Sequence, residues 1–218
     1  MKLLQGDCIE LLKEVRDNSI DLIVTDPPYG LDKYGVKNDG DIWAYKLSDY
    51  YRVLKDNSWI ALYSSIKEIG NVIKEIETLG FVYEWQHITY INNGMVRGRL
   101  GFNKYMVCLI FRKGVSKIKK QICDIKVVSN SSKRRNAIKH PTPKYTEAIE
   151  DIIKNLSKEG DLVLDCFMGS GSTGIACKNL NRDFIGMELD EKYFKLSKQR
   201  IDDALHESKD DNNVEGVA

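Results

Sequence analysis

Residues 19–30 read SIDLIVTDPPYG, and this stretch decides how the rest of the chain is interpreted. The part Ile20–Thr25 is an apolar run of strand length. The two prolines end that strand, because proline lacks a backbone N–H and pushes the residue before it into an extended conformation. The resulting stiff turn presents backbone carbonyls, the carboxylate of Asp26 and the ring of Tyr29. It can therefore accept hydrogen bonds from an amino group and stack on a planar ring, although a plain proline turn after a core strand is the simpler alternative.

The composition is that of one globular domain, with or without a small insertion. The chain has 218 residues, of which 42% are hydrophobic and 30% charged. No apolar run is long enough for a membrane span, and the N-terminus lacks a signal-peptide pattern. The five cysteines form no C-x-x-C pair and indicate reduced thiols in a cytoplasmic protein. The three histidines are scattered, so we expect no metal site.

Charge is distributed unevenly along the chain. The stretch from Arg112 to Lys139, here called the basic run, has ten basic residues and one acid and a net charge of +9. A solvated surface loop is one interpretation, and binding of a polyanion is the other. Residues 202–218 carry a net charge of −5. We expect residues 207–218 to form a disordered acidic tail.

Helical and strand patterns alternate almost throughout the chain. The expected helices are 9–15, 47–55, 66–79, 148–156, 175–180 and 190–205, and the expected strands are 2–7, 20–25, 59–63, 81–91, 105–111, 160–167 and 184–188. The strands 81–91 and 105–111 flank a polar loop and favour a hairpin. The alternation predicts an α/β fold, a doubly wound and mostly parallel sheet that also contains an antiparallel hairpin. We expect residues 1–206 to form a single domain, with 112–139 as an insertion.

A glycine-rich turn follows the expected strand 160–167. Gly169 and Gly171 stand between this strand and a helix, where backbone can approach a ligand closely. Glu188 ends the following strand, and an acid there can accept hydrogen bonds from both hydroxyls of a ribose. The third glycine of a pyrophosphate-binding pattern is not well matched, so a nucleoside without pyrophosphate is the better ligand. A tight turn needed only for packing is the alternative.

Two of these segments together resemble a known family. Asp26-Pro27-Pro28-Tyr29 is similar to the catalytic motif of the amino-group DNA methyltransferases, which methylate adenine N6 or cytosine N4. Residues 165–173, DCFMGSGST, resemble that family's loop for S-adenosylmethionine. The resemblance implies a Rossmann-like methyltransferase fold, S-adenosyl-L-methionine as cofactor and a cytoplasmic protein of bacterial or phage type. The catalytic residues it implies are Asp26, Pro27, Pro28 and Tyr29.

The resemblance also assigns a cofactor site. Glu188 matches the ribose-binding acid, and Asp7, after Gly6, matches a residue near the cofactor's adenine. The segment 140–144, HPTPK, looks like the family's segment near the methionine moiety, although Tyr145 replaces its last proline. The cofactor-binding residues implied are Asp7, Asp26, His140, Thr142, Lys144, Asp165, Phe167, Gly169, Ser170, Gly171, Ser172, Thr173 and Glu188.

The order of the motifs resembles the β arrangement of these enzymes, in which the catalytic motif precedes the cofactor loop. Members of that type usually carry target recognition between the hairpin and the H-P-T segment, where this chain has the basic run. The implied partner is double-stranded DNA, and no membrane is expected. We expect Lys133, Arg134 and Arg135 to contact phosphates and Arg97 and Arg99 to reach guanine edges. Because the basic run is short, a second subunit could extend the length of DNA that the protein contacts. A homodimer is therefore one expectation.

The motif also implies a chemistry. Asp26 and the Pro27 carbonyl would accept hydrogen bonds from the target amino group and aim its lone pair at the methyl group, while Tyr29 stacks on the flipped base. The Asp form of the motif resembles adenine-N6 enzymes more often than cytosine-N4 enzymes. Cytosine N4 remains the alternative, as does a catalytically idle DNA-binding homologue. Related N-P-P-Y enzymes modify protein glutamine, which the basic run argues against.

Overall fold

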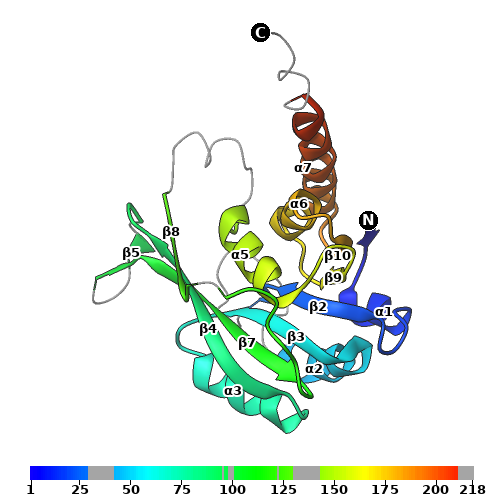
Figure 1. The fold of residues 1–218 in the computed structure, drawn as a ribbon, viewed down its shortest axis with the longest axis vertical. Coiled ribbons are helices and arrows are strands. Elements are labelled where there is room, and N and C mark those ends of the chain that lie inside the picture. The colour runs from blue at the N-terminus through cyan, green and yellow to red at the C-terminus, as the bar shows by residue number, and fades with distance from the viewer. Residues whose placement is uncertain (29–41, 95, 98–100, 122, 130–142, 211–218) are drawn as a thin grey trace.

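The computed structural model describes residues 1–28, 42–94, 96–97, 101–121, 123–129 and 143–210 (Figure 1). Side chains are described for all of these except residues 42–47, 96–97 and 205–210.

The core of the molecule is one mixed sheet of eight strands in the order β1-β10-β9-β2-β3-β7-β4-β8. The strands are β1 Lys2–Gln5, β2 Ile20–Thr25, β3 Leu54–Ser64, β4 Val82–Ile91, β7 Tyr105–Lys113, β8 Ile125–Val128, β9 Leu162–Asp165 and β10 Asp183–Glu188. Among the described strands of this sheet, only β7 runs antiparallel to its neighbours, β3 and β4. The short strands β5 (Val96–Arg97) and β6 (Phe102–Asn103) form a ribbon between β4 and β7. The predicted doubly wound, mostly parallel sheet with an antiparallel hairpin is therefore confirmed.

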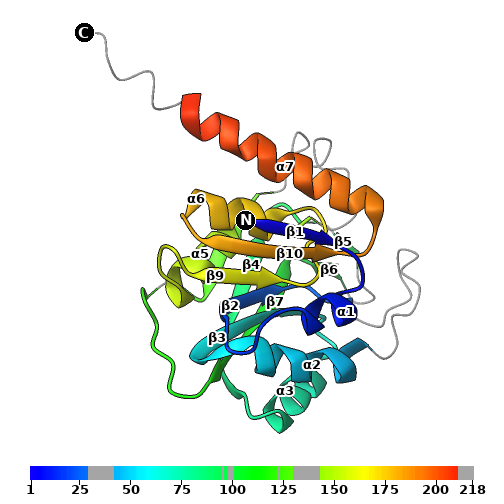
Figure 2. The same cartoon turned by 90° about the vertical axis from the view of Figure 1, so that its right-hand side faces the viewer.

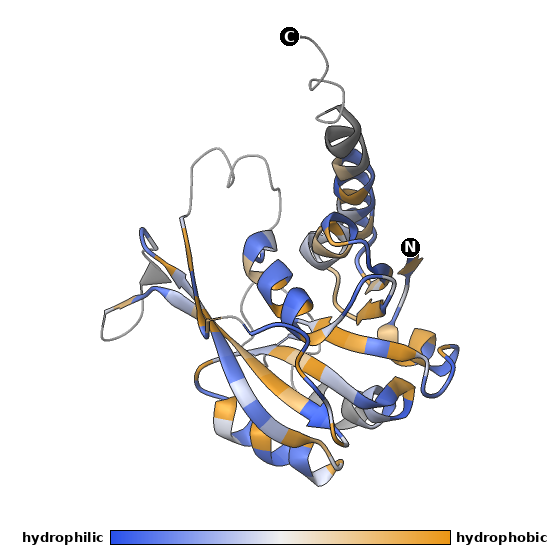
Figure 3. Cartoon of the chain, viewed as in Figure 1, coloured by the Kyte–Doolittle hydropathy of each residue, from blue (hydrophilic) through white to orange (hydrophobic). Residues whose placement is uncertain are grey.

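Helices cover both faces of the sheet. On one face lie α1 (Cys8–Lys13), α2 (Ile42–Val53) and α3 (Ile69–Thr78), and on the other lie α5 (Thr146–Leu156), α6 (Ser172–Asn179) and α7 (Glu191–Asp210). Successive strand residues point to opposite faces, so each strand supplies both layers. In β2, for example, Ile23 packs with the α1–α3 layer and Val24 with the α5–α7 layer. The central strands are accordingly largely hydrophobic in Figure 3.

Helix α5 shows how local pattern and packing agree. Its isoleucines and its last leucine recur at i, i+3 and i+4, and all of them are buried: Ile149, Ile152, Ile153 and Leu156. The helix ends at Ser157, whose backbone is extended and whose Oγ donates to the Ile153 carbonyl at 2.7 Å. The predicted helix over 148–156 is confirmed, and the structure begins it at Thr146.

Three segments differ from the expected elements. Strand β3 already begins at Leu54, because Leu54 pairs with Ile20 in β2 and is fully buried. Within the basic run, where an arm or small hairpin packed on the main domain is the expectation, the structure has strand β8, which pairs in parallel with the edge of β4. Helix α7 continues to Asp210, past the expected end near 205 and into the expected tail. Alanine, leucine, glutamate and lysine in this segment favour helix.

Helix α7 lies along the β1 edge of the sheet and extends beyond it (Figure 2). Among the helices that the structure describes, none is long and apolar enough to cross a membrane.

Candidate active site

The carboxyl ends of the parallel strands β1, β10, β9, β2 and β3 meet at one edge of the sheet. From β9 the chain returns through α6 to β10 on one side, and from β2 it returns through α2 to β3 on the other. The boundary between β9 and β2 is thus the topological switch point, where sheets of this kind bind ligands. The two motifs singled out in the sequence follow β2 and β9, so the topology brings them together.

The acceptor turn, residues Asp26–Pro28, follows β2. Pro27 is buried, and Asp26 and Pro28 are half-buried. Oδ2 of Asp26 forms an ion pair with Nζ of Lys144, and their side chains are 24% and 13% exposed. The same ammonium lies 5.2 Å from the centre of the Tyr63 ring, at the end of β3. The carboxylate predicted to be catalytic therefore sits beside a fixed cation in a partly dehydrated setting.

Lys144 also connects the acceptor turn to the second motif. Its backbone carbonyl accepts a hydrogen bond of 3.0 Å from the hydroxyl of Ser172, the first residue of α6. Ser172 in turn lies 3.3 Å, oxygen to oxygen, from the hydroxyl of Ser170. The residue predicted to lie near the methionine moiety is thus held between Asp26 and the glycine loop.

The glycine loop, residues 166–171, follows β9 and leads into α6. Gly169 and Gly171 have φ angles of 51° and 80°, which side chains with a Cβ rarely adopt. A Cβ on Gly171 would also lie 3.0 Å from the Cβ of Ser197. The loop therefore depends on both glycines, and it places the first amides of α6 at the switch point.

Glu188 ends β10 and faces this loop. Its Oε2 accepts the Gly169 amide at 2.8 Å, and its Oε1 accepts the Asp190 amide at 2.9 Å. Burial raises the pKa of Glu188, and the two amide hydrogen bonds oppose that rise. Each carboxylate oxygen can accept more than one hydrogen bond, so both retain capacity for ribose hydroxyls.

Asp7 reaches the same edge from β1. The Gly6 amide donates to the Glu188 carbonyl at 2.9 Å, which brings the end of β1 beside the end of β10. Oδ1 of Asp7 accepts the Ile9 amide at 2.9 Å and caps α1. Asp7 therefore has a structural role in addition to the predicted position near the cofactor's adenine.

Asp165 is the most enclosed acid of the site. It is 3% exposed, and its oxygens accept hydrogen bonds from Thr25, Thr173 and the Phe167 amide. Burial raises its pKa from an ordinary 3.8 to about 6, and these hydrogen bonds limit the rise. The hydrogen bond from Thr25 to Asp165 joins the carboxyl ends of β2 and β9.

Several predicted site residues lie outside the described part of the chain. These are Tyr29, Arg99, Lys133, Arg134, Arg135, His140 and Thr142. The backbone of Arg97 belongs to β5 and pairs with Phe102 in the ribbon between β4 and β7. The ribbon extends from the carboxyl end of β4, at the same edge as the acceptor turn (Figure 1).

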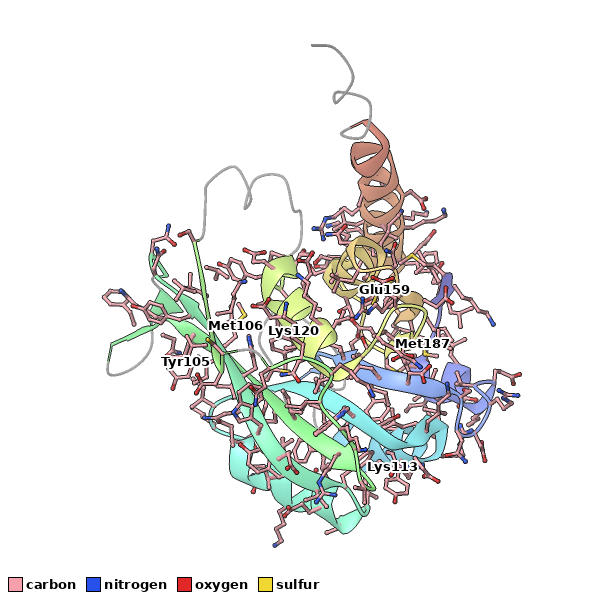
Figure 4. All side chains as sticks on the ribbon, in the orientation of Figure 1. Tyr105, Met106, Lys113, Lys120, Glu159 and Met187 are labelled. Carbon is pink, nitrogen blue, oxygen red and sulfur yellow. The ribbon has the colours of Figure 1, made fainter. Side chains whose placement is uncertain are left out.

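Some lysines of the basic run have internal partners. Nζ of the buried Lys113 donates to the carbonyls of Tyr51 and Leu54 at 2.9 and 2.7 Å, at the C-terminal end of α2. Nζ of Lys126 pairs with Asp151 at 2.9 Å. Figure 4 places Lys113 and Tyr105 at opposite ends of β7. The run therefore offers less free positive charge than its sequence suggests.

Two residues of the site were not anticipated from the sequence. Thr25 binds Asp165, and Tyr63 lies under the Lys144 ammonium. The only available signal was that each is a polar or aromatic residue at the end of an apolar strand. Among the described residues, no group of three histidine, cysteine, aspartate or glutamate side chains could hold a metal ion.

The family comparison decides what this arrangement represents. The DNA methylase family model of the N6/N4 type matches residues 20–199, which include the acceptor turn, the glycine loop and Glu188. The chain belongs to this family. It is a DNA methyltransferase, as the resemblance implied.

Individual relatives agree with that assignment. The type II methyltransferase M.HpaI of Haemophilus parainfluenzae is 32% identical over 92% of this chain and 74% of its own length. The type II methyltransferase M2.MboI of Moraxella bovis is 29% identical over 90% of this chain and 85% of its own.

Solved structures share the fold. The M1.HpyAVI–SAM complex superposes with a TM-score of 0.78 at 28% identity, covering 92% of this chain and 98% of that one. The cytosine-N4-specific PvuII DNA methyltransferase superposes with a TM-score of 0.73 at 19% identity, covering 94% and 90%. The second likeness concerns the fold alone.

Proposed function

We propose that this methyltransferase transfers a methyl group from S-adenosyl-L-methionine to N6 of adenine in double-stranded DNA. The observation that carries the proposal is the placement of Asp26 across the switch point from the glycine loop. Lys144 bridges the two, through its ammonium to Asp26 and through its carbonyl to Ser172. An amino-group acceptor site and a nucleoside site thus face each other.

The residues present fit S-adenosylmethionine. The glycine loop offers close backbone approach, and Glu188 is oriented by two amides with acceptor capacity left for ribose hydroxyls. Asp7 lies at the adjoining strand end, where the adenine would lie. When bound, this cofactor supplies an activated methyl group on a sulfonium.

The acceptor turn prepares the nitrogen that is methylated. Asp26 and the Pro27 carbonyl accept hydrogen bonds from the amino group, which favours a tetrahedral nitrogen whose lone pair points at the methyl. Tyr29 stacks on the flipped base. Positioning and electrostatics are sufficient for direct in-line transfer, and no covalent enzyme intermediate is required. The Lys144 ammonium holds the Asp26 carboxylate in place.

DNA contacts complete the proposal. Arg97 and Arg99, in the segment 92–103, would reach base edges, and Lys133, Arg134 and Arg135 would contact phosphates. A cytoplasmic location and a homodimer, which would lengthen the footprint, also remain predictions.

The choice of adenine over cytosine rests on Asp26. The Asp form of the motif resembles adenine-N6 enzymes, whereas Ser at this position is typical of cytosine-N4 members. Mass spectrometry of nucleosides from unmethylated bacterial DNA, incubated with the protein and cofactor, tests this directly. N6-methyladenine is the expected product, and N4-methylcytosine would replace the proposal with its alternative.

The control for that assay is Asp26→Ala, which should bind cofactor but form no methylated nucleoside. Parallel incubations with RNA and with protein should yield no product. A wild-type protein that binds DNA yet methylates neither base would support the idle homologue instead.

A further inference from the structure

The two motifs of the active site are joined by a buried hydrogen-bond network centred on Asp165. Thr25 donates its hydroxyl to Oδ1 at 2.7 Å, and Thr173 donates to Oδ2, also at 2.7 Å. The Phe167 amide adds a third bond to Oδ1 at 3.0 Å. The three side chains are only 1%, 5% and 3% exposed for Thr25, Thr173 and Asp165, so water does not compete for these bonds.

The position of this network in the sheet is informative. Between β2 and β9 the backbone ladder has only two paired positions, Leu22 with Val163 and Ile23 with Leu164. On their outer sides the same strands pair further, β2 with β3 as far as Thr25 and β9 with β10 as far as Asp165. The ladder is therefore shortest at the switch point, and the bond from Thr25 to Asp165 continues the connection beyond its last pair.

We propose that Thr25 is a positioning residue that sets the acceptor turn relative to the glycine loop. Thr25 directly precedes Asp26, and Asp165 directly precedes the loop that ends at Gly171. A displacement of one strand end against the other would move Asp26 relative to the bound methyl donor. Thr25 itself touches neither substrate, because its hydroxyl is buried against Asp165.

This inference rests on the proposed methyl transfer. In that reaction the sulfonium–methyl bond would break as the methyl–nitrogen bond forms, the donor would leave as a thioether, and the amino nitrogen would lose one proton to water. The rate of such a step depends steeply on the line and distance between donor and acceptor. A misplacement of about 1 Å can cost about 100-fold in rate.

The test compares Thr25→Val, which keeps the shape and removes the donor, with Thr25→Ser, which keeps the donor. We expect Thr25→Val to lower kcat by about 10- to 100-fold. The dissociation constant of S-adenosylmethionine, measured by calorimetry, should change by less than about threefold, because Asp165 keeps its hydrogen bonds from Thr173 and the Phe167 amide, which hold the glycine loop. Thr25→Ser should retain kcat within about threefold of wild type.

Ser157→Ala is the matched control for a lost buried hydroxyl. Its Oγ donates to the Ile153 carbonyl at 2.7 Å, at the end of α5 remote from the acceptor turn. It should lower the melting temperature and leave kcat unchanged, which separates alignment from general destabilisation. If Thr25→Val does not fold, Thr25→Cys takes its place, because a thiol is a weaker hydrogen-bond donor than a hydroxyl. The kcat of Thr25→Cys should then be lower than that of Thr25→Ser.

Three results would overturn the inference: an unchanged kcat in Thr25→Val, a loss confined to cofactor affinity, or equal impairment of the Ser and Val variants. The last would show that the hydroxyl donor does not set the rate, because Thr25→Ser keeps that donor. A wild-type protein without activity on any DNA would refute the proposed function, whereas a wild-type protein that methylates cytosine still permits the Thr25 comparison.

Discussion

Replacing Asp165 with asparagine should make the stability of the protein less dependent on pH. Burial raises the pKa of Asp165 from 3.8 to about 6, so the folded state binds this proton more tightly than the unfolded state. A raised acid pKa contributes stability that is fully present below about pH 3.8 and is lost as pH rises through about 6. The full pKa difference between the folded and unfolded states corresponds to about 3 kcal/mol of unfolding free energy.

The measurable part of this change lies at accessible pH. Between about pH 4.5 and about pH 7.5, linkage predicts that the wild type loses about 2 kcal/mol relative to Asp165→Asn. For a chain of this length that is a relative shift of about 4–8 °C in melting temperature. Asparagine keeps the size of the side chain and an acceptor for Thr25 and Phe167, so the fold should persist.

Urea unfolding of both proteins at the two pH values measures the difference directly. The comparison cancels the other carboxylates, which titrate equally in both proteins. Asp183→Asn, whose wild-type side chain is 69% exposed, is the control and should show no such pH-dependent difference. The reasoning is wrong if the difference in unfolding free energy between wild type and Asp165→Asn is constant with pH, or if it changes in the opposite direction.

Further predictions concern the cofactor, the base and DNA. Glu188→Ala should weaken S-adenosylmethionine binding by about 1.5–3 kcal/mol, because a charged acceptor is lost; an unchanged calorimetric affinity would leave Glu188 as a loop-orienting residue only. Tyr29→Phe should retain more activity than Tyr29→Ala, because loss of a base–aromatic stack costs about 1–3 kcal/mol; equal rates in single-turnover assays would argue against stacking. Replacing Lys133, Arg134 and Arg135 with Ala should weaken binding to target and non-target duplexes alike and flatten the salt dependence by a slope of about 0.9 per lost phosphate contact. Titrations at several salt concentrations check this, and an unaltered slope would make the segment a solvated loop.

The sequence by itself determined the elements whose cause is local. The apolar spacing of α5, the prolines that end β2 and the paired glycines after β9 each fix backbone conformation within a few residues. The order of the motifs was also sufficient for the family and for the expectation of a nucleoside site.

Only the tertiary structure decided which distant groups meet. Thr25 and Asp165 are 140 positions apart, and Lys144 and Asp26 are 118 apart, so their pairing depends on strand order rather than on any local period. The same holds for β8, which becomes a strand because it pairs with the edge strand position beside β4. Lys113 was counted as surface charge, yet its ammonium is buried and donates to two backbone carbonyls at the end of α2. No sequence pattern links Lys113 to those carbonyls. Local patterns encode conformation, whereas the electrostatics of this site arise from groups that folding alone brings into contact.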